Sequence, residues 1–131
     1  MLEKGIKGHC EEKVTEELTA KNIGSGLLAV YATPALASLI EKTAWESVSG
    51  CLQEGQGTVG TKLNISHLSA TPVGMTVRCD TCLTEVDGRR LTFSAEVFDN
   101  AGKIAEGSHE RFIVDNERFE KKAYGKTAPK A

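Results

Sequence analysis

The sequence lacks any long run of apolar residues. Nothing in its 131 residues approaches the roughly 20 consecutive apolar side chains that span a bilayer, and residues 1–13 mix lysine and glutamate where a signal peptide needs an apolar centre. We therefore expect a cytoplasmic protein with no membrane partner.

An excess of charge of either sign is also absent. Lys and Arg total 16 against 18 Asp and Glu, which gives a formal net charge of -2. Such a balance provides no bulk attraction to nucleic acid or to an anionic membrane surface. Hydrophobic residues at 40% and charged residues at 26% are typical of a folded globular chain, and its length predicts a single domain over 1–131.

Clusters of metal-binding residues are missing as well. Cys79 and Cys82 form a C-x-x-C pair within a stretch of alternating polarity, where residues three apart point to opposite faces of a strand. The three histidines contain no H-x-x-x-H pair. We expect no metal and no cofactor, and we interpret all four cysteines, which also include Cys10 and Cys51, as free thiols.

One long amphipathic helix is predicted from Thr33 to about Gly50. Thr33 followed by Pro34 is typical of an N-cap and a first helical position, because the missing N–H of proline costs nothing there. Apolar and small side chains then recur at spacings of three and four for about 17 residues.

Strand-like alternation begins at residue 58. From Val59 to His67 the odd-numbered residues are predicted to share one face, and the even-numbered ones, Gly60 among them, the other. Similar runs at 75–86, 91–98 and 103–114 are separated by turn residues, which predicts an antiparallel meander of four strands. With a weaker strand at 9–14, the order defines an α+β fold, a sheet wrapped around one helix. From about 117 the chain is interpreted as a solvated, frayed polar tail, with phosphate binding as the lesser alternative.

Three polar residues stand out from the core pattern. Glu41 aligns with Ala37 and Trp45 at the margin of the apolar helix stripe, where a carboxylate is costly unless it is hydrogen-bonded or used. His67 ends the apolar face of its strand, and the hydroxyl of Thr33 lies at the positive end of the helix dipole. Each has a structural alternative: a solvated or lysine-paired glutamate, a hydrogen-bonded core histidine and a helix cap.

Together these residues supply a hydroxyl, a carboxylate and an imidazole, the components of acyl-transfer chemistry, and Gly60 adds an unhindered backbone N–H. Eight residues separate Thr33 from Glu41, about 12 Å along a helix, so they form no compact triad unless Thr33 lies off the helix end or the substrate lies between them. A domain of this size has little interior for a pocket, so a second copy is expected to supply one wall.

Several segments resemble the hot-dog-fold thioesterases, and within them the fluoroacetyl-CoA thioesterase-like group. The resemblance runs from about Leu27 to Lys121, and its specific part is the run from His67 to Gly74 followed by the late His109-Glu110-Arg111. The matching segments are 32–34 with Glu41, 54–61, 65–77, 87–91 and 107–112.

This resemblance implies a helix packed in a curved antiparallel sheet, and a homodimer with a continuous sheet and active sites at the interface. Pairing of dimers into tetramers stays open. It implies a thioester hydrolase acting on acyl-CoA, with Thr33, Glu41 and His67 as the catalytic set, Gly60 stabilising the oxyanion and Arg111 organising the pocket. Whether Thr33 or Glu41 carries an acyl intermediate, or water attacks directly, also stays open.

The segment before Thr33 bears on the substrate. In the family, selection of a fluorinated acetyl group depends on bulky, often aromatic residues there, whereas residues 27–31 are aliphatic except for Tyr31. We expect a short or medium acyl-CoA, with fluoroacetyl-CoA as one candidate. The alternatives are a non-catalytic acyl-CoA-binding or sensing dimer and a hot-dog dehydratase or hydratase acting on acyl thioesters, although the aspartate that the latter needs is not seen.

Overall fold

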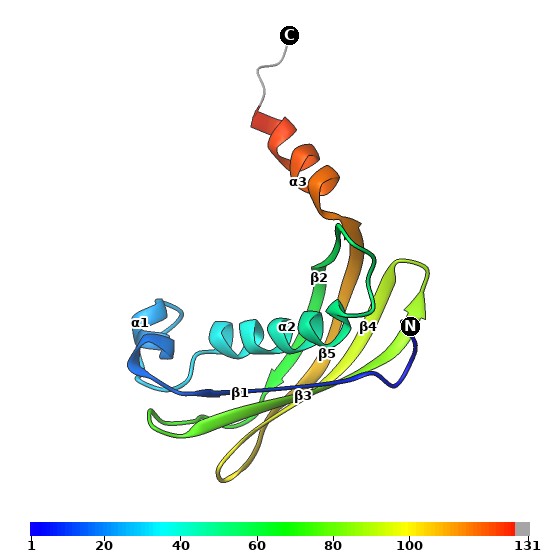
Figure 1. The fold of residues 1–131 in the computed structure, drawn as a ribbon. Helices are drawn as coiled ribbons and strands as arrows, with labels where there is room; N and C mark the ends of the chain where they lie inside the picture. Colours follow the sequence, from blue (N-terminus) through cyan, green and yellow to red (C-terminus); the bar gives the residue numbers. More distant parts are fainter. Residues whose placement is uncertain (128–131) are drawn as a thin grey trace.

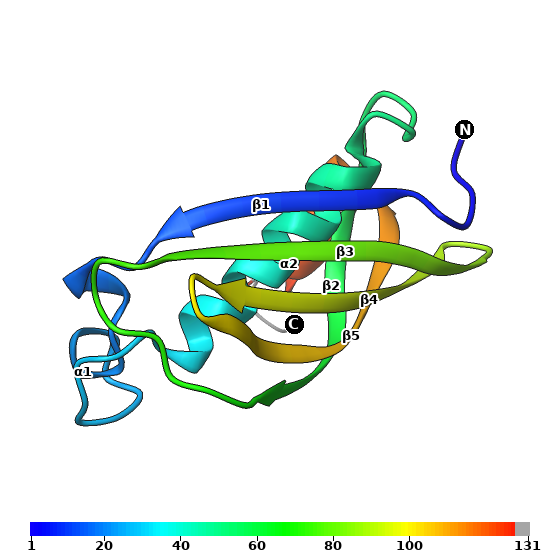
Figure 2. The same cartoon turned by 90° about the horizontal axis from the view of Figure 1, so that it is seen from below.

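The computed structural model describes residues 1–127. A long helix lies across one face of a curved, five-stranded antiparallel sheet (Figure 1, Figure 2), as the α+β prediction requires. The elements in chain order are β1 (Lys7–Lys13), the 3-10 turn η1 (Glu16–Leu18), α1 (Ala20–Ile23), α2 (Thr33–Ser49), β2 (Gln56–His67), β3 (Thr76–Asp87), β4 (Arg90–Asp99), β5 (Gly102–Asp115), α3 (Asn116–Tyr124) and η2 (Gly125–Thr127).

The strand order in the sheet is β1-β3-β4-β5-β2. Strands β3, β4 and β5 form the predicted meander, but the expectation that β2 opens this meander is wrong. It pairs instead with β5, from Gln56 opposite Asp115 to His67 opposite Ala105. Residues 68–75 link β2 to β3, and this link is longer than the roughly two to five residues of a hairpin loop, so β2 can occupy the far edge.

Helix α2 buries one stripe of side chains against the sheet. Leu36, Ile40 and Val48 are fully buried, whereas Trp45 on the flank is 44% exposed. The helix has the predicted 17 residues, but the N-cap is Ala32, and Thr33 is the first helical residue. No side chain caps this end, so the hydroxyl of Thr33 is free for another partner.

A β-bulge at Thr61 changes which residues of β2 face the helix. The register shifts between Gly60 and Lys62, which leaves Thr61 as the extra residue. Its hydroxyl donates to the carboxylate of Glu110 at 2.7 Å, while Gly60 faces Glu41 of α2. The predicted strict alternation is therefore wrong before the bulge and correct after it.

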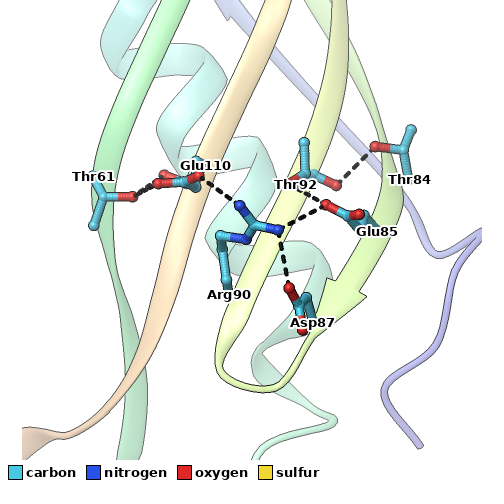
Figure 3. A network of polar contacts seen from close by, with 7 residues as sticks. All are labelled: Thr61, Thr84, Glu85, Asp87, Arg90, Thr92 and Glu110. Carbon is cyan, nitrogen blue, oxygen red and sulfur yellow. Dashed lines mark hydrogen bonds and ion pairs between the residues drawn. The ribbon is translucent and has the colours of Figure 1, made fainter.

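A polar network covers the sheet face turned away from α2 (Figure 3). The guanidinium of Arg90 lies 3.3 Å from Glu85, 3.1 Å from Asp87 and 3.9 Å from Glu110. Because Glu110 also accepts from Thr61, this network reaches the bulge and holds its extra residue outward.

The C-terminal segment is helical where a frayed tail was expected. Helix α3 continues directly from β5 and projects beyond the sheet (Figure 1), and every one of its residues is exposed, in agreement with the predicted solvation. Lys130, counted in that tail, lies outside the described residues. Within 1–127 no helix is both long and apolar enough to cross a membrane.

Candidate active site

Thr33 and His67 meet at the start of α2. The Thr33 Oγ1 atom lies 2.8 Å from the Nδ1 atom of His67, which ends β2. The threonine is exposed and the histidine is half-buried. A threonine placed one residue earlier would direct its hydroxyl to the helix backbone as a cap, so its place inside the helix leaves it available to the imidazole.

Backbone contacts hold the helix start against the loop that follows His67. The Tyr31 N–H donates to the Thr71 carbonyl at 2.9 Å, and Val30 forms a bridge with Pro72. Thr71 is fully buried, and its hydroxyl donates to Asp99 at 2.8 Å. Buried backbone and side-chain hydrogen bonds next to Thr33 and His67 therefore fix the positions of both residues.

Burial lowers the pKa of His67, and a backbone hydrogen bond with Ser69 offsets part of this effect. The imidazole is consequently neutral at pH 7 and able to accept a proton. Its Nε2 atom is buried and has no hydrogen-bond partner among residues 1–127. The pair lines a surface hollow together with Ala20, Ser25, Val30, Leu68, Ser69 and Ala70.

Glu41 lies two turns further along α2 and contacts Arg111 of β5. The Arg111 Nη1 atom donates to Glu41 Oε2 at 3.5 Å, and the Arg111 side chain is 7% exposed against 46% for Glu41. Arg111 also donates from Nε to the Thr58 hydroxyl at 2.8 Å and from Nη2 to the Thr58 carbonyl at 2.9 Å. The buried guanidinium is thus fixed, and it presents one N–H to a carboxylate that solvent can reach.

His109 makes the fourth hydrogen bond of the Arg111 side chain. Its Nε2 atom lies 3.1 Å from Arg111 Nη1, and its Nδ1 atom lies 2.9 Å from the carbonyl oxygen of Lys62. Burial lowers the pKa of His109, and the charge of Arg111 lowers it further. Sequence reasoning gave His109 no role, although it lies two residues before Arg111 on the same face of β5, a spacing that could have singled it out.

Gly60 lies beside Glu41, His109 and Arg111. A Cβ atom at Gly60 would lie 2.7 Å from Glu41 Oε2, 3.2 Å from His109 Cε1 and 3.3 Å from Arg111 Nη1. Only glycine leaves this space open. Glu41 and Arg111 line a hollow with Ser38, Lys42 and Trp45, and neither Thr33 nor His67 takes part in it.

The five expected site residues therefore form two groups within one chain. The first is Thr33 with His67, and the second is Glu41 with Gly60 and Arg111. No group of three or more His, Cys, Asp or Glu side chains within the part of the chain that the structure describes is arranged to hold a metal ion.

A single long helix across a curved antiparallel sheet, with a hydroxyl–imidazole pair at its start and a carboxylate on its flank, defines the chain as a hot-dog-fold protein of the thioesterase class. The model of the family "Fluoroacetyl-CoA-specific thioesterase" matches residues 14–117. The chain belongs to this family, which confirms the resemblance inferred from the sequence.

Comparisons with individual proteins agree with this family assignment. The chain is 35% identical over 98 residues to the fluoroacetyl-CoA thioesterase of Streptantibioticus cattleyicolor, an alignment that covers 75% of this chain and 70% of the relative. A solved structure of a fluoroacetyl-CoA thioesterase superposes with a TM-score of 0.92 at 27% identity and covers 98% of this chain and 99% of that chain. A hot-dog-like protein from Thermanaerovibrio acidaminovorans gives 0.89 at 25% identity, with 97% and 94% covered.

Proposed function

We propose that the protein hydrolyses short or medium acyl-CoA thioesters and that Thr33, His67 and Glu41 carry the reaction. Family membership supports the reaction class. The observation that carries the assignment of residues is the 2.8 Å contact between Thr33 Oγ1 and His67 Nδ1, because it joins a hydroxyl to a neutral imidazole at the positive end of a helix.

In the proposed reaction, one water molecule is added across the thioester. The acyl carbon gains an oxygen, the C–S bond breaks, and the thiolate of CoA takes a proton. His67 accepts the proton of the attacking hydroxyl or water at Nδ1 and returns it to the leaving sulfur. Glu41 acts either as the group that receives the acyl chain or as the partner that orients water, with Arg111 fixing its position. We place the Gly60 N–H at the developing oxyanion, since no side chain shields it.

We also propose a homodimer formed through β2. Of the two edge strands, β1 has 7 residues, four of them charged, whereas β2 has 12 residues, of which only Lys62 is formally charged at pH 7. A long, weakly charged edge is a template for pairing with another strand. Antiparallel pairing of two β2 strands would continue the sheet and bring both copies of α2 to one two-fold axis.

In such a dimer, Glu41 and Arg111 of one copy would face Thr33 and His67 of the other. This arrangement agrees with the separate hollows that the two groups line in one chain. Ala37 lies midway between Thr33 and Glu41, and its small side chain would allow close approach of two helices at the axis.

The decisive test measures thiol release from acetyl-, fluoroacetyl-, propionyl-, butyryl- and an aromatic acyl-CoA. We expect turnover of aliphatic acyl groups, because Leu27 and Leu28 before α2 are exposed and aliphatic. Tight binding of every acyl-CoA without thiol release would instead identify an acyl-CoA sensor. Unchanged turnover in both His67→Ala and Glu41→Ala would contradict the proposed residues.

Mixing two inactive variants tests the shared site. When Thr33→Ala and Glu41→Gln chains are unfolded together and refolded, half of the dimers are mixed, and each mixed dimer has one intact site if the groups come from different chains. About a quarter of wild-type activity should return. Refolding each variant alone is the control, and no recovery in the mixture would place both groups of one site in the same chain.

A further inference from the structure

We propose that His109 is a positioning residue of the active site, and that it acts as a neutral imidazole with its proton on Nδ1, which holds Arg111 against Glu41. The proposal rests on the proposed function only for its kinetic consequence. The contact itself can be tested without turnover.

The chemistry of its two neighbours fixes the protonation state of His109. The carbonyl oxygen of Lys62 can only accept a hydrogen bond, so the Nδ1 atom at 2.9 Å must carry the proton. A guanidinium can only donate, so the Nε2 atom at 3.1 Å from Arg111 must be the unprotonated acceptor. A second proton would place N–H against N–H and two positive charges side by side.

Burial has the strongest influence on His109, and it favours the uncharged ring. His109 is 2% exposed, and the ring centroid lies 6.2 Å from that of Phe93 on β4. The charged groups acting on it are Arg111 and Glu110 on β5 and Glu41 on α2, whereas β2 contributes the backbone carbonyl of Lys62. Arg111 disfavours imidazolium and the two carboxylates favour it, but burial has the largest effect and keeps the ring neutral.

His109 also connects Arg111 to the bulge of β2. The Lys62 carbonyl that it binds follows directly on the extra residue Thr61, which Glu110 holds from the opposite face of the sheet. Adjacent residues of β5 therefore hold the bulge from both sides, and the bulge in turn keeps Gly60 facing Glu41. Loss of His109 is expected to release both Arg111 and the backbone beside it.

The first test reads the ring nitrogens of the wild-type protein by long-range ¹H–¹⁵N correlation. His109, assigned from the spectrum of His109→Gln, should show a neutral ring protonated at Nδ1 near pH 7. The other two histidines serve as internal references: His9, whose pKa is raised by its hydrogen bonds to Asp80 and Glu11, and His67, whose pKa is lowered. A neutral ring protonated at Nε2, or a charged ring, would overturn the proposal whether or not the protein hydrolyses thioesters.

The second test compares two substitutions by thiol release. His109→Leu removes the acceptor for Arg111 and should lower kcat by about 10- to 100-fold, with a smaller change in KM, because a misplaced Glu41 affects the reacting geometry. His109→Gln offers an amide oxygen to Arg111 and should recover most of kcat. In an Arg111→Gln background, His109→Leu should have little further effect. Equal losses in the Leu and Gln variants, or additive losses with Arg111→Gln, would show that His109 contributes only to packing.

Discussion

The two groups of the candidate active site, Thr33 with His67 and Glu41 with Gly60 and Arg111, are built differently. Thr33 and His67 share one side-chain hydrogen bond, at an exposed helix start, whereas Arg111 makes four and is almost entirely buried beneath Glu41. The first group is held by the backbone around it, mainly through Tyr31 and Thr71. The second group is held by hydrogen bonds that its own side chains make, chiefly those of Arg111.

Because of this difference, substitutions in the two groups should affect catalysis and folding stability in different proportions. A side chain that contacts the fold at one exposed point can be changed with little effect on folding, whereas removing a buried, fully bonded group leaves its partners unsatisfied. We therefore expect substitutions in the Thr33–His67 pair to impair catalysis alone, and substitutions around Arg111 to impair catalysis and folding together.

The largest effect is expected from His67→Ala. Loss of a general base typically costs about 10²- to 10⁴-fold in rate, and we expect a decrease of that size in kcat for acyl-CoA hydrolysis. The thermal unfolding midpoint should stay close to that of the wild type. His9→Ala is the matched control, because His9 is an exposed histidine on β1, distant in sequence from both groups, and should leave kcat unchanged. A large loss of stability in His67→Ala would remove the contrast between the two groups.

Arg111→Gln, unlike His67→Ala, should lower folding stability strongly. The change leaves Thr58 and His109 without their donor in a buried site, so the free energy of unfolding should fall by about 2–4 kcal/mol. Thr33→Ala should change it by less than about 0.5 kcal/mol. Denaturant unfolding of both variants gives the comparison, and equal losses would contradict it.

The first group was also the more predictable from sequence. Thr33 followed by Pro34 marked the start of α2, although as a cap and not as the first helical residue, and the end of the alternating run located His67. The second group depends on the bulge at Thr61 and on the pairing of β2 with β5. Neither is visible in a local pattern, because a bulge shifts the register by one residue and strand order depends on contacts distant in sequence. The spacing of His109 from Arg111 placed both on one face of β5, but its contact with the Lys62 carbonyl depends on the same strand pairing.

Gly60→Ala tests how tightly Glu41, His109 and Arg111 are packed around Gly60. The new methyl group would meet Glu41 Oε2 at 2.7 Å, a distance at which the carboxylate must move. We expect kcat to fall by about tenfold and the free energy of unfolding by about 1–3 kcal/mol. Gly50→Ala is the control, since a methyl group there meets nothing within 4 Å and φ is -73°. If the two variants behave alike, Glu41 is not confined as described.

The smallest expected effect is a shift in the pH dependence of the Thr33–His67 pair. Only the neutral imidazole accepts a proton, and burial lowers the pKa of His67 below its ordinary value of 6.5, so activity should persist to a lower pH than an exposed histidine would allow. The measurement is kcat/KM between about pH 5 and 8 in the His109→Gln variant, where His67 is the one imidazole left at the site. If kcat/KM falls to half of its maximum at pH 6.5 or above, either His67 is more solvated in the working enzyme than in this structure, or His67 is not the base. Repeating the profile with Thr33→Ser, which keeps the hydroxyl, distinguishes these two explanations. If the pH of half-maximal kcat/KM moves with this substitution, the titrating group is His67, the hydrogen-bonded partner of Thr33.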